Sequence, residues 1–386
     1  MPDIRHQLLF FINTKQLMNN TKILFVIPGL QLGGAERVVS LMANHWAKQG
    51  HTVSIIIFND QPAYYELHSN IALHSLHSAA NKMGVFSKIT NNLKRPVRYF
   101  KTIKKIRPDI IISFTDNANV FCLLYNFLVK KPLIITQRTN PYYCTLPPLL
   151  LKLPGLIYKS ADGMVVQTEQ TLELYKQLKI TLPGTTVVIF NPLKDPLPPI
   201  DEYKQRDNII LAVGRLYNKD KHYDQLINIF NEIDAKGWEL HIAGDGPDKD
   251  KLQEQVRQLK LEGRVILRGS DKDIMPLYQQ AKIFALTSQF EGFPNALCEA
   301  MANGCACISY DCPTGPAAII TPSKNGILVE LGDKAAFSKQ LSALMNDESM
   351  IKNLSVAAYT IRETLHENNI LAKWELLISE ILKQRK

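Results

Sequence analysis

Long hydrophobic runs are absent from the 386-residue sequence, because no uninterrupted apolar stretch approaches the ~20 residues of a membrane-spanning helix. The apolar patch near the start, residues 8–12, is short and has polar flanks. It would suit an N-terminal extension, residues 1–20, that touches a membrane. We favour the simpler interpretation that translation begins at Met18, just before the first predicted strand.

Cysteine is also scarce, and the six cysteines lack the paired spacings of metal-binding motifs. No secretory signal precedes them, so reduced thiols in a cytoplasmic protein are the simplest interpretation. Acidic residues number 36 against 45 Lys and Arg, which gives a formal net charge of +9. This charge favours anionic partners such as nucleotides, anionic lipids or nucleic acid. No RNA- or DNA-binding module is recognisable, so we expect no nucleic-acid partner.

The sequence has no GxGxxG dinucleotide fingerprint, although a glycine-containing loop, residues 29–34, follows the first apolar run. A strand (22–28), a helix (35–49) and a second strand (51–58) surround that loop in the order typical of a doubly wound parallel sheet. Later apolar runs predict strands at residues 109–114, 133–137, 164–167, 186–190, 208–213, 238–243, 264–267, 282–287, 305–310 and 327–329.

The chain is too long for one compact core. A segment rich in proline and charge, residues 191–206, interrupts the alternation of strands and helices and is interpreted as a linker. We therefore predict an α/β fold with two Rossmann-like, doubly wound domains, residues 21–190 and 207–365, that face a central cleft. A C-terminal helix, residues 366–386, would cross back to the first domain. Ligands of such sheets bind outside the carboxyl ends of the strands.

Two carboxylates, Glu291 and Glu299, bracket a turn at residues 292–295. The turn leads into a helix of small and apolar residues, 296–302, and Pro294 suits its start. Backbone N–H groups at a helix start can bind hydroxyls or phosphates, and the two carboxylates could accept from a sugar and from a ribose diol. A role as surface acids near a helix N-terminus fits Glu299 only weakly, because its neighbours are apolar.

A second cluster follows the first strand of the second domain. Gly214 and Arg215 end that strand, and Lys221 precedes a helix. Glycine admits a ligand to the backbone, while the two cations would hold a diphosphate and stabilise its charge as it leaves. A strand-end glycine with two solvated cations is an equally compatible interpretation of this cluster alone. The next strand ends in a tight turn, residues 244–247, where we interpret Asp245 as structural.

Together these motifs resemble a known family. The resemblance rests on GGAERV, VGRL with its downstream lysine, AGDGP and EGFPNALCEAMANG, and it points to the retaining glycosyltransferases of family 4, which have the GT-B fold. It runs from about Lys22 to the C-terminus, and the Glu-x7-Glu motif is its specific part. The continuation ISYDCPTGPAAII resembles bacterial enzymes that build capsule, O-antigen and other lipid-linked glycans.

The resemblance implies a nucleotide-sugar donor, with UDP-sugar favoured and GDP-sugar as the alternative, and neither a metal nor another cofactor. It implies that Arg215 and Lys221 bind the diphosphate, that Glu299 binds the ribose, and that Glu291 acts at the sugar. Arg215, Lys221 and Glu291 would form the catalytic set. The donor-binding set would also include Gly33, Gly34, Gly214, Gly244, Phe293, Pro294, Asn295, Ala296 and Leu297.

The sequence departs from the family pattern in two places. Many members carry a histidine near the end of a first-domain strand, where this chain reads TQRTNP, residues 136–141. That segment is similar to a variant with Arg-Asn-Asp-Pro, which makes Arg138 and Asn140 candidates for the sugar or acceptor side. His222 stands where glycine often follows the lysine, and we interpret it as a helix start.

Residues 87–107 carry eight cations and no acid, with the aromatic residues Phe86, Tyr99 and Phe100 interleaved. We predict a helix that Pro96 opens and a surface that contacts anionic membrane, where each cation adds ~1 kcal/mol. A solvated basic face is the alternative. The predicted membrane-facing residues are Lys94, Arg95, Arg98, Lys101, Lys104 and Lys105.

We therefore predict a retaining hexosyltransferase of surface-polysaccharide biosynthesis, peripheral to the cytoplasmic face of the membrane and a monomer or weak homodimer. It would move a hexose or N-acetylhexosamine from a nucleotide sugar to a glycan acceptor, expected to be linked to polyprenyl diphosphate. Alternatives are a phosphorylase, which would need a pyridoxal lysine site, and an epimerase, which would need no acceptor sugar. A non-catalytic anion- or membrane-binding protein is disfavoured by the intact set of cations and glutamates.

Overall fold

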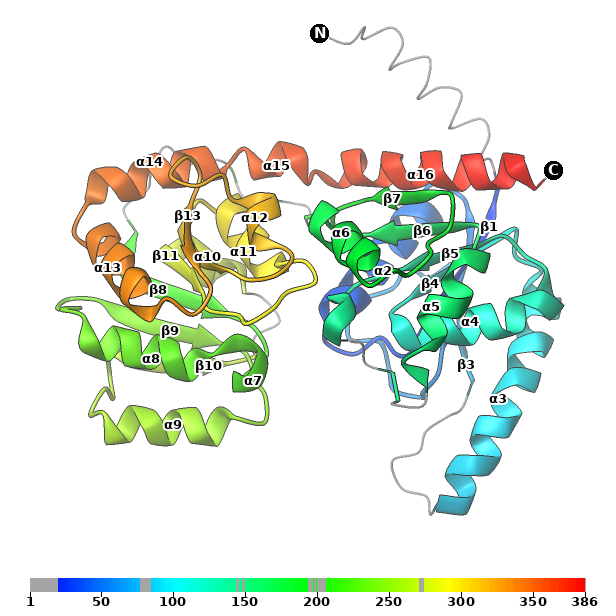
Figure 1. The fold of residues 1–386 in the computed structure, drawn as a ribbon, viewed down its shortest axis with the longest axis horizontal. Helices are drawn as coiled ribbons and strands as arrows, with labels where there is room; N and C mark the ends of the chain where they lie inside the picture. Colours follow the sequence, from blue (N-terminus) through cyan, green and yellow to red (C-terminus); the bar gives the residue numbers. More distant parts are fainter. Residues whose placement is uncertain are drawn as a thin grey trace, which may run out of the picture. The chain divides into compact units, whose positions relative to one another are not determined.

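The computed structural model describes residues 20–76, 85–143, 146–147, 150–193, 197, 199, 206–270 and 274–385, with residues 85–93 described by their backbone alone (Figure 1). The chain divides into two compact units, each described here by itself. Unit 1 comprises residues 1–192 and 367–386, and unit 2 comprises residues 193–366. The predicted N-terminal extension and most of the predicted linker lie outside the described residues.

Unit 1 is built on a seven-stranded sheet of order β3-β2-β1-β4-β5-β6-β7, in which every neighbouring pair is parallel. Its strands are β1 (Lys22–Ile27), β2 (Thr52–Ile57), β3 (Ala72–Ser75), β4 (Ile110–Phe114), β5 (Leu133–Thr136), β6 (Gly163–Val166) and β7 (Thr186–Val188). The central strands β4, β5 and β6 are buried along their whole length. Continuous apolar runs of this kind are typical of a parallel sheet that helices cover on both faces.

The helices of unit 1 come from both ends of the chain. They are α2 (Gly34–Lys48), α3 (Val85–Ile106), α4 (Asp116–Val129), α5 (Leu153–Ile157), α6 (Glu169–Gln177) and α16 (Glu367–Gln384), with short 3-10 turns η1 (Pro141–Tyr143) and η3 (Tyr158–Ser160). Helix α16 belongs to the core of unit 1, because the ring of Trp374 stacks on that of Phe114 with centroids 6.3 Å apart.

Unit 2 repeats the arrangement with a six-stranded parallel sheet of order β10-β9-β8-β11-β12-β13. Its strands are β8 (Asp207–Val213), β9 (Glu239–Ala243), β10 (Val265–Gly269), β11 (Ala281–Leu286), β12 (Ala306–Asp311) and β13 (Ile327–Glu330). Its helices are α7 (Asn218–Lys221), α8 (Tyr223–Glu232), α9 (Lys249–Gln258), α10 (Met275–Gln280), α11 (Asn295–Ala302), α12 (Pro316–Ile319), α13 (Lys334–Met345), α14 (Glu348–Ala358) and α15 (Ile361–Thr364).

The strand order reverses beside the first strand of each unit. In unit 1, β1 lies between β2 and β4, and in unit 2, β8 lies between β9 and β11. Loops diverge at such a point, which leaves a crevice at the carboxyl ends of the strands. The predicted class, two doubly wound Rossmann-like parallel sheets, is confirmed.

One strand was not predicted. β3 is an edge strand of four residues, ALHS, in which no side chain is fully buried. A short edge strand needs no apolar run, so it leaves no hydrophobic signal in the sequence.

The prediction that Pro96 opens a helix is wrong, because Pro96 lies inside α3, which begins at Val85. Proline removes one intrahelical hydrogen bond and usually ends or kinks a helix. In α3 the helix continues through it, and Tyr99 and Ile103, which follow Pro96, are buried in the core.

Five of the six cysteines lie in the described part of the chain, and all five are free and buried. Burial raises the pKa of Cys305 to about 11 and that of Cys122 to about 12, so both are neutral thiols at physiological pH. Cys144 lies outside the described residues.

Candidate active site

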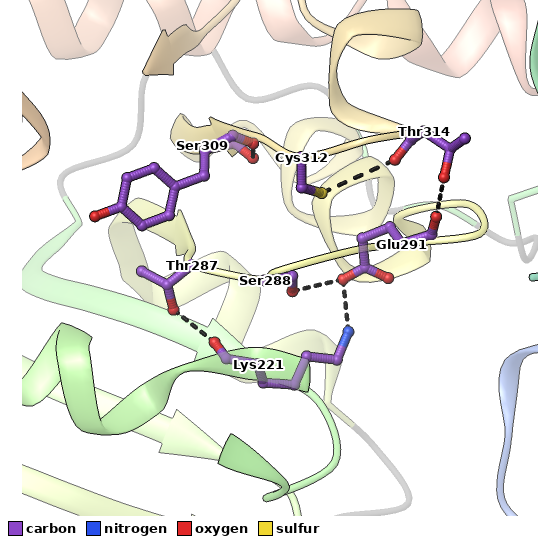
Figure 2. A network of polar contacts seen from close by, with 8 residues as sticks. Lys221, Thr287, Ser288, Glu291, Ser309, Cys312 and Thr314 are labelled. Atoms are coloured by element: carbon purple, nitrogen blue, oxygen red, sulfur yellow. Dashed lines mark hydrogen bonds and ion pairs between the residues drawn. The ribbon is translucent and has the colours of Figure 1, made fainter. Parts of the chain in front are cut away.

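A polar cluster in unit 2 joins two loops at the carboxyl ends of β8 and β11. Lys221 Nζ lies 2.5 Å from Glu291 Oε1, and Ser288 Oγ donates to the same oxygen at 2.7 Å (Figure 2). The side chains of Lys221 and Glu291 are 20% and 11% exposed, so a ligand can reach the pair. The predicted diphosphate cation and the predicted sugar carboxylate therefore meet, although 70 residues separate them in the chain.

The order of the strands in the sheet brings Lys221 and Glu291 together. β8 and β11 are parallel hydrogen-bonded neighbours, so their following loops leave at the same edge. Thr287 Oγ1 donates to the Lys221 carbonyl at 2.8 Å, and the Gln289 N–H donates to the Asp220 carbonyl at 2.8 Å. These bonds fasten the end of α7 to the loop after β11, which fixes the backbone positions of both charged residues.

His222 separates α7 from α8 and has a φ of 51°, in the left-handed region. Glycine is favoured in that region, which gives a physical reason for glycine at this place in the family. The interpretation of His222 as a helix start is confirmed.

Arg215 is exposed in the loop after β8, with its Cζ 5.7 Å from the centroid of the Tyr217 ring. It is close enough to influence Asp220, whose pKa is raised by burial and pulled back by Lys221, Lys219 and Arg215. Three cations thus act on one carboxyl group around α7, and the Glu291 carboxylate opposes them, so this is a field of concentrated cations. Such a field suits an anionic ligand.

Gly214 and Gly244 lie at the ends of β8 and β9 and have φ values of 155° and 147°. A Cβ on Gly244 would lie 1.9 Å from the Gly214 carbonyl oxygen, and one on Gly214 would lie 2.8 Å from the Tyr223 hydroxyl. Protein packing alone therefore requires both glycines. Their contacts with a donor stay predictions.

The loop after β12 holds the Glu291 loop in place. Thr314 Oγ1 donates to the Glu291 carbonyl, and Cys312 Sγ donates to the Thr314 carbonyl at 3.9 Å (Figure 2). Burial raises the pKa of Cys312, and the Glu291 carboxylate adds to the rise. Cys312 is therefore a neutral thiol that supports the loop.

Glu299 lies on α11, and its Oε2 accepts a hydrogen bond of 3.1 Å from the hydroxyl of Tyr278. Pro294 immediately precedes α11, and its carbonyl accepts from the Cys298 N–H at 3.0 Å, as expected for a helix start. The Asn295 N–H donates to the Phe293 carbonyl at 2.9 Å. One of the backbone N–H groups predicted to bind the sugar therefore already has a partner within the protein.

The remaining predicted residues of this segment differ in exposure. Phe293, Pro294 and Leu297 are buried, whereas Asn295 and Ala296 are partly exposed. Any contact of the three buried residues with a donor would therefore run mainly through their backbone.

Gly33 and Gly34 lie in unit 1, at the start of α2. The Gly33 carbonyl accepts from the Arg37 N–H at 3.0 Å and from the Tyr65 hydroxyl at 3.3 Å, which fixes the loop. Glu36 follows in the first turn of α2, and its burial raises its pKa.

Arg138 is buried at the carboxyl end of β5 in unit 1. Its Nη1 donates to Asn191 Oδ1 at 2.6 Å, its Nε donates to Thr136 Oγ1 at 3.3 Å, and its Cζ lies 4.4 Å from the centroid of the Phe114 ring. Its buried Nη2 has no hydrogen-bond partner among the described residues. Burial lowers the pKa of Arg138 to about 9, so the group still carries its charge at neutral pH.

Asn140 is buried close by in sequence, and its Oδ1 accepts from the Tyr142 N–H at 3.0 Å. Arg138 and Asn140 are thus both integrated into unit 1. Their predicted place at the sugar or acceptor is untested and stays a prediction.

The basic helix α3 differs in part from its prediction. Arg95 and Arg98 turn toward unit 1, since Arg95 Cζ lies 4.9 Å from the centroid of the Phe58 ring and Arg98 Nη1 donates to the Leu76 carbonyl at 3.0 Å. Both side chains are only partly exposed and have partners within the protein, whereas their contact with a membrane stays a prediction. Lys94, Lys101, Lys104 and Lys105 are exposed.

The aromatic part of that prediction also changes. Tyr99 is fully buried, and Phe100 packs on Tyr125 of α4 with ring centroids 5.8 Å apart. The exposed apolar residues lie elsewhere on α3 and α4. Among the residues of these helices whose side chains the structure describes, they are Val97, Leu124, Phe127 and Leu128.

Three contact residues escaped the sequence analysis: Ser288, Tyr278 and Thr314. Each touches one of the two glutamates, but none has a spacing that signals the contact. Thr314 lies in the segment CPTGP, which the family resemblance had marked, and this is the one signal that could have found it.

In the described part of the chain, no group of three or more His, Cys, Asp or Glu residues is arranged to hold a metal ion. No helix there is long and apolar enough to cross a bilayer.

Comparison with known proteins matches each of the two units to a glycosyltransferase family model. The model "Glycosyltransferase Family 4" matches residues 32–194, and the model "Glycosyl transferases group 1" matches residues 195–361. Among solved structures, Anabaena HepE in complex with UDP has a TM-score of 0.76 at 18% identity, with 93% of this chain and 100% of that chain covered. This likeness supports the fold.

Two curated relatives match nearly full length. An α-1,4-N-acetyl-D-galactosaminyltransferase of Campylobacter jejuni, named for a diphospho-undecaprenol-linked glycan, is 28% identical over 365 residues, which cover 93% of this chain and 99% of the relative. The amylovoran biosynthesis glycosyltransferase AmsD of Erwinia amylovora is 28% identical over 366 residues, with the same coverage of both chains. Since the two family models adjoin and correspond to the two parallel-sheet units, the chain belongs to the family 4 glycosyltransferases, with the GT-B fold.

Proposed function

We propose that this glycosyltransferase moves a hexose or N-acetylhexosamine, with retention of anomeric configuration, from a UDP-sugar to a glycan carried on polyprenyl diphosphate. The observation that carries the proposal is the Lys221–Glu291 pair at 2.5 Å, at the carboxyl edge of the unit 2 sheet. It places a cation for a diphosphate beside a carboxylate for sugar hydroxyls. Ligands of doubly wound sheets bind at this edge.

The residues divide the chemistry among them. Lys221 and Arg215 neutralise the diphosphate as negative charge develops on the leaving group. Glu291, fixed by Ser288 and by the Thr314 contact to its carbonyl, accepts from the sugar hydroxyls and orients the anomeric carbon. Glu299 accepts from the ribose diol, and the backbone of residues 293–297 lines the sugar.

The donor needs no metal in this proposal. Arg215, Lys219 and Lys221 lie around α7, and their positive charges would take the part that a divalent cation plays at other diphosphate sites. UDP is favoured over GDP because solved relatives of the same fold, such as Anabaena HepE, are complexes with UDP.

The acceptor is proposed from the relatives. The Campylobacter jejuni enzyme is named for a diphospho-undecaprenol-linked glycan, and AmsD is named for amylovoran biosynthesis. A lipid-linked acceptor places the enzyme at the cytoplasmic face of a membrane as a peripheral protein. Arg138 and Asn140 of unit 1 are the candidate residues on the sugar or acceptor side.

The surface of α3 and α4 supports membrane contact. Lys94, Lys101, Lys104 and Lys105 are exposed on α3. On α4, Phe127 is 68% exposed and Leu128 is 58% exposed. Helices that carry exposed cations and exposed apolar side chains are typical of a surface that lies on an anionic bilayer.

The proposal is tested by thermal-shift screening against UDP, GDP and their sugars, followed by a transfer assay with synthetic polyprenyl-diphosphate-linked glycans. We expect stabilisation by UDP and a glycosylated lipid whose new linkage keeps the donor's anomeric configuration by NMR. Stabilisation by none of these ligands would overturn the proposal. Sugar release without an acceptor would favour an epimerase, and an inverted linkage would exclude retention.

A further inference from the structure

Tyr278 is a buried tyrosine of unit 2 whose hydroxyl reaches the predicted ribose-binding carboxylate. It lies on α10 and is fully buried, and its ring packs against Phe284 of β11 with centroids 6.1 Å apart. Its hydroxyl donates to Glu299 Oε2 at 3.1 Å, and Glu299 itself is only partly buried. A neutral donor inside the unit thus holds a carboxylate at its edge.

The backbone of Tyr278 is held from two other elements. Arg206 Nη1 donates to the Tyr278 carbonyl at 2.8 Å and to the Ala281 carbonyl at 2.9 Å. Cys305 Sγ, just before β12, donates to the Tyr278 carbonyl at 3.2 Å. These bonds to the main chain leave the tyrosine ring little freedom to shift.

The backbone of Glu299 is fixed as well. The side-chain amide of Asn303 donates to the Glu299 carbonyl at 2.8 Å, and the Asn303 N–H donates to the same carbonyl at 3.0 Å. The hydrogen bond from Tyr278 therefore joins two residues with anchored main chains, and it selects one orientation of the Glu299 carboxylate.

A carboxylate can accept about four hydrogen bonds through its two oxygens. The bond from Tyr278 uses one of these positions, and the two hydroxyls of a vicinal diol need two more on a carboxylate plane that is correctly turned. We propose that Tyr278 is a positioning residue, whose hydroxyl turns Glu299 so that it accepts from the ribose diol of the donor nucleotide. This inference rests on the proposed nucleotide-sugar donor.

The two possible roles of Tyr278, ribose recognition and packing alone, predict different effects on nucleotides with and without the ribose diol. If Tyr278 only fills the core, its loss weakens every nucleotide to the same extent. If it positions Glu299, its loss weakens a nucleotide with the diol and spares one without it.

The test compares UDP with 2′,3′-dideoxy-UDP by titration calorimetry in wild type, Tyr278→Phe and Glu299→Gln. Tyr278→Phe keeps the ring and removes only the hydroxyl. We expect wild type to prefer UDP by about 10-fold, and both variants to bring this preference close to one. The affinity for dideoxy-UDP should stay within about twofold of wild type in Tyr278→Phe.

Tyr310→Phe is the matched control, because Tyr310 is also buried in unit 2 and its buried hydroxyl has no hydrogen-bond partner among the described residues. It should keep the wild-type preference. A wild-type preference in Tyr278→Phe, or an equal loss for both nucleotides, would overturn the inference while Glu299→Gln still supports ribose binding. A wild-type preference in Glu299→Gln would overturn the ribose assignment and this inference with it.

Discussion

The two units hold their cations in opposite ways. Lys221 of unit 2 is 20% exposed and contacts a carboxylate oxygen at 2.5 Å. Arg138 of unit 1 is buried, and its hydrogen bonds go to the neutral side-chain oxygens of Thr136 and Asn191. The aromatic rings of Phe114 and Trp374 lie 4.4 Å and 6.0 Å from its Cζ.

This difference separates a charge that can exchange partners from one that is fixed. The Lys221–Glu291 pair is partly open to solvent, so a ligand anion can compete with the carboxylate for Lys221. A buried guanidinium has lost its hydration, and its neutral partners and the ring faces compensate only in part. Lys221 is therefore suited to binding and release, whereas Arg138 is held in one place inside unit 1.

The largest effect is expected on the exchangeable charge. Glu291→Ala should lower transfer by about 10²–10³-fold, because the sugar loses its carboxylate and Lys221 loses the group that places it. Steady-state kinetics would measure this loss, and a cooperative thermal transition would show that the variant is folded. Glu232→Ala, which removes an exposed carboxylate of α8, is the control and should leave turnover unchanged. Normal turnover in Glu291→Ala would refute the assigned role.

Removal of the fixed charge, that of Arg138, should lower the stability of unit 1. Arg138→Ala is expected to lower the free energy of unfolding of unit 1 by about 3 kcal/mol, because it leaves a void beside Phe114 and removes the hydrogen bond to Asn191. Urea denaturation followed by tryptophan fluorescence in a Trp238→Phe background would assign the transition to unit 1, which holds Trp46 and Trp374.

Arg138→Met sharpens this prediction. Methionine keeps much of the side-chain length and removes the charge, so the cost of burying that charge disappears. It should destabilise unit 1 less than alanine does. Equal stability of wild type and Arg138→Ala would contradict the structural role.

The surfaces of the two units should also differ in how strongly they bind anionic membranes. The triple change Lys101→Glu, Lys104→Glu and Lys105→Glu should weaken binding to anionic vesicles by up to about 100-fold, because each cation near the bilayer adds ~1 kcal/mol. Vesicle sedimentation would measure the binding. The same charge change at the exposed residues Lys236, Lys249 and Lys260 of unit 2 is the control and should have a smaller effect. Equal binding by wild type and the α3 variant would exclude α3 as the contact.

The smallest effect is expected where a loop only supports the paired charge. Thr314→Val removes the hydroxyl that donates to the Glu291 carbonyl and should raise the KM for the donor several-fold, about 1 kcal/mol. Thr314→Ser keeps the hydroxyl and should behave like wild type. Identical KM values for the valine and serine variants would show that the contact does not position Glu291.

The sequence predicted the sheets well because their strands are continuous apolar runs, as in Ile110–Phe114 and Ala281–Leu286. The family resemblance put Lys221 and Glu291 in one site, and the sheet explains their contact, because parallel neighbouring strands bring their carboxyl ends to one edge. The edge strand β3 left no such signal, since its residues are exposed or half-buried.

The orientation of long side chains was beyond the sequence. The basic run in α3 gives no indication that Arg95 covers Phe58 while Lys94 faces solvent. The burial of Arg138 depends on Trp374, which the chain supplies only in its last helix. Such contacts depend on tertiary packing, and local pattern cannot reveal them.

One hydrogen bond has a consequence for the order of folding. The Leu193 N–H donates to the Leu365 carbonyl at 3.0 Å, so the two ends of unit 2 lie side by side. Unit 2 is therefore an insertion whose ends already meet, while unit 1 awaits α16, which follows it in the chain. During synthesis on the ribosome unit 2 can reach its native state first, and unit 1 becomes complete only when Trp374 arrives to pack on Phe114.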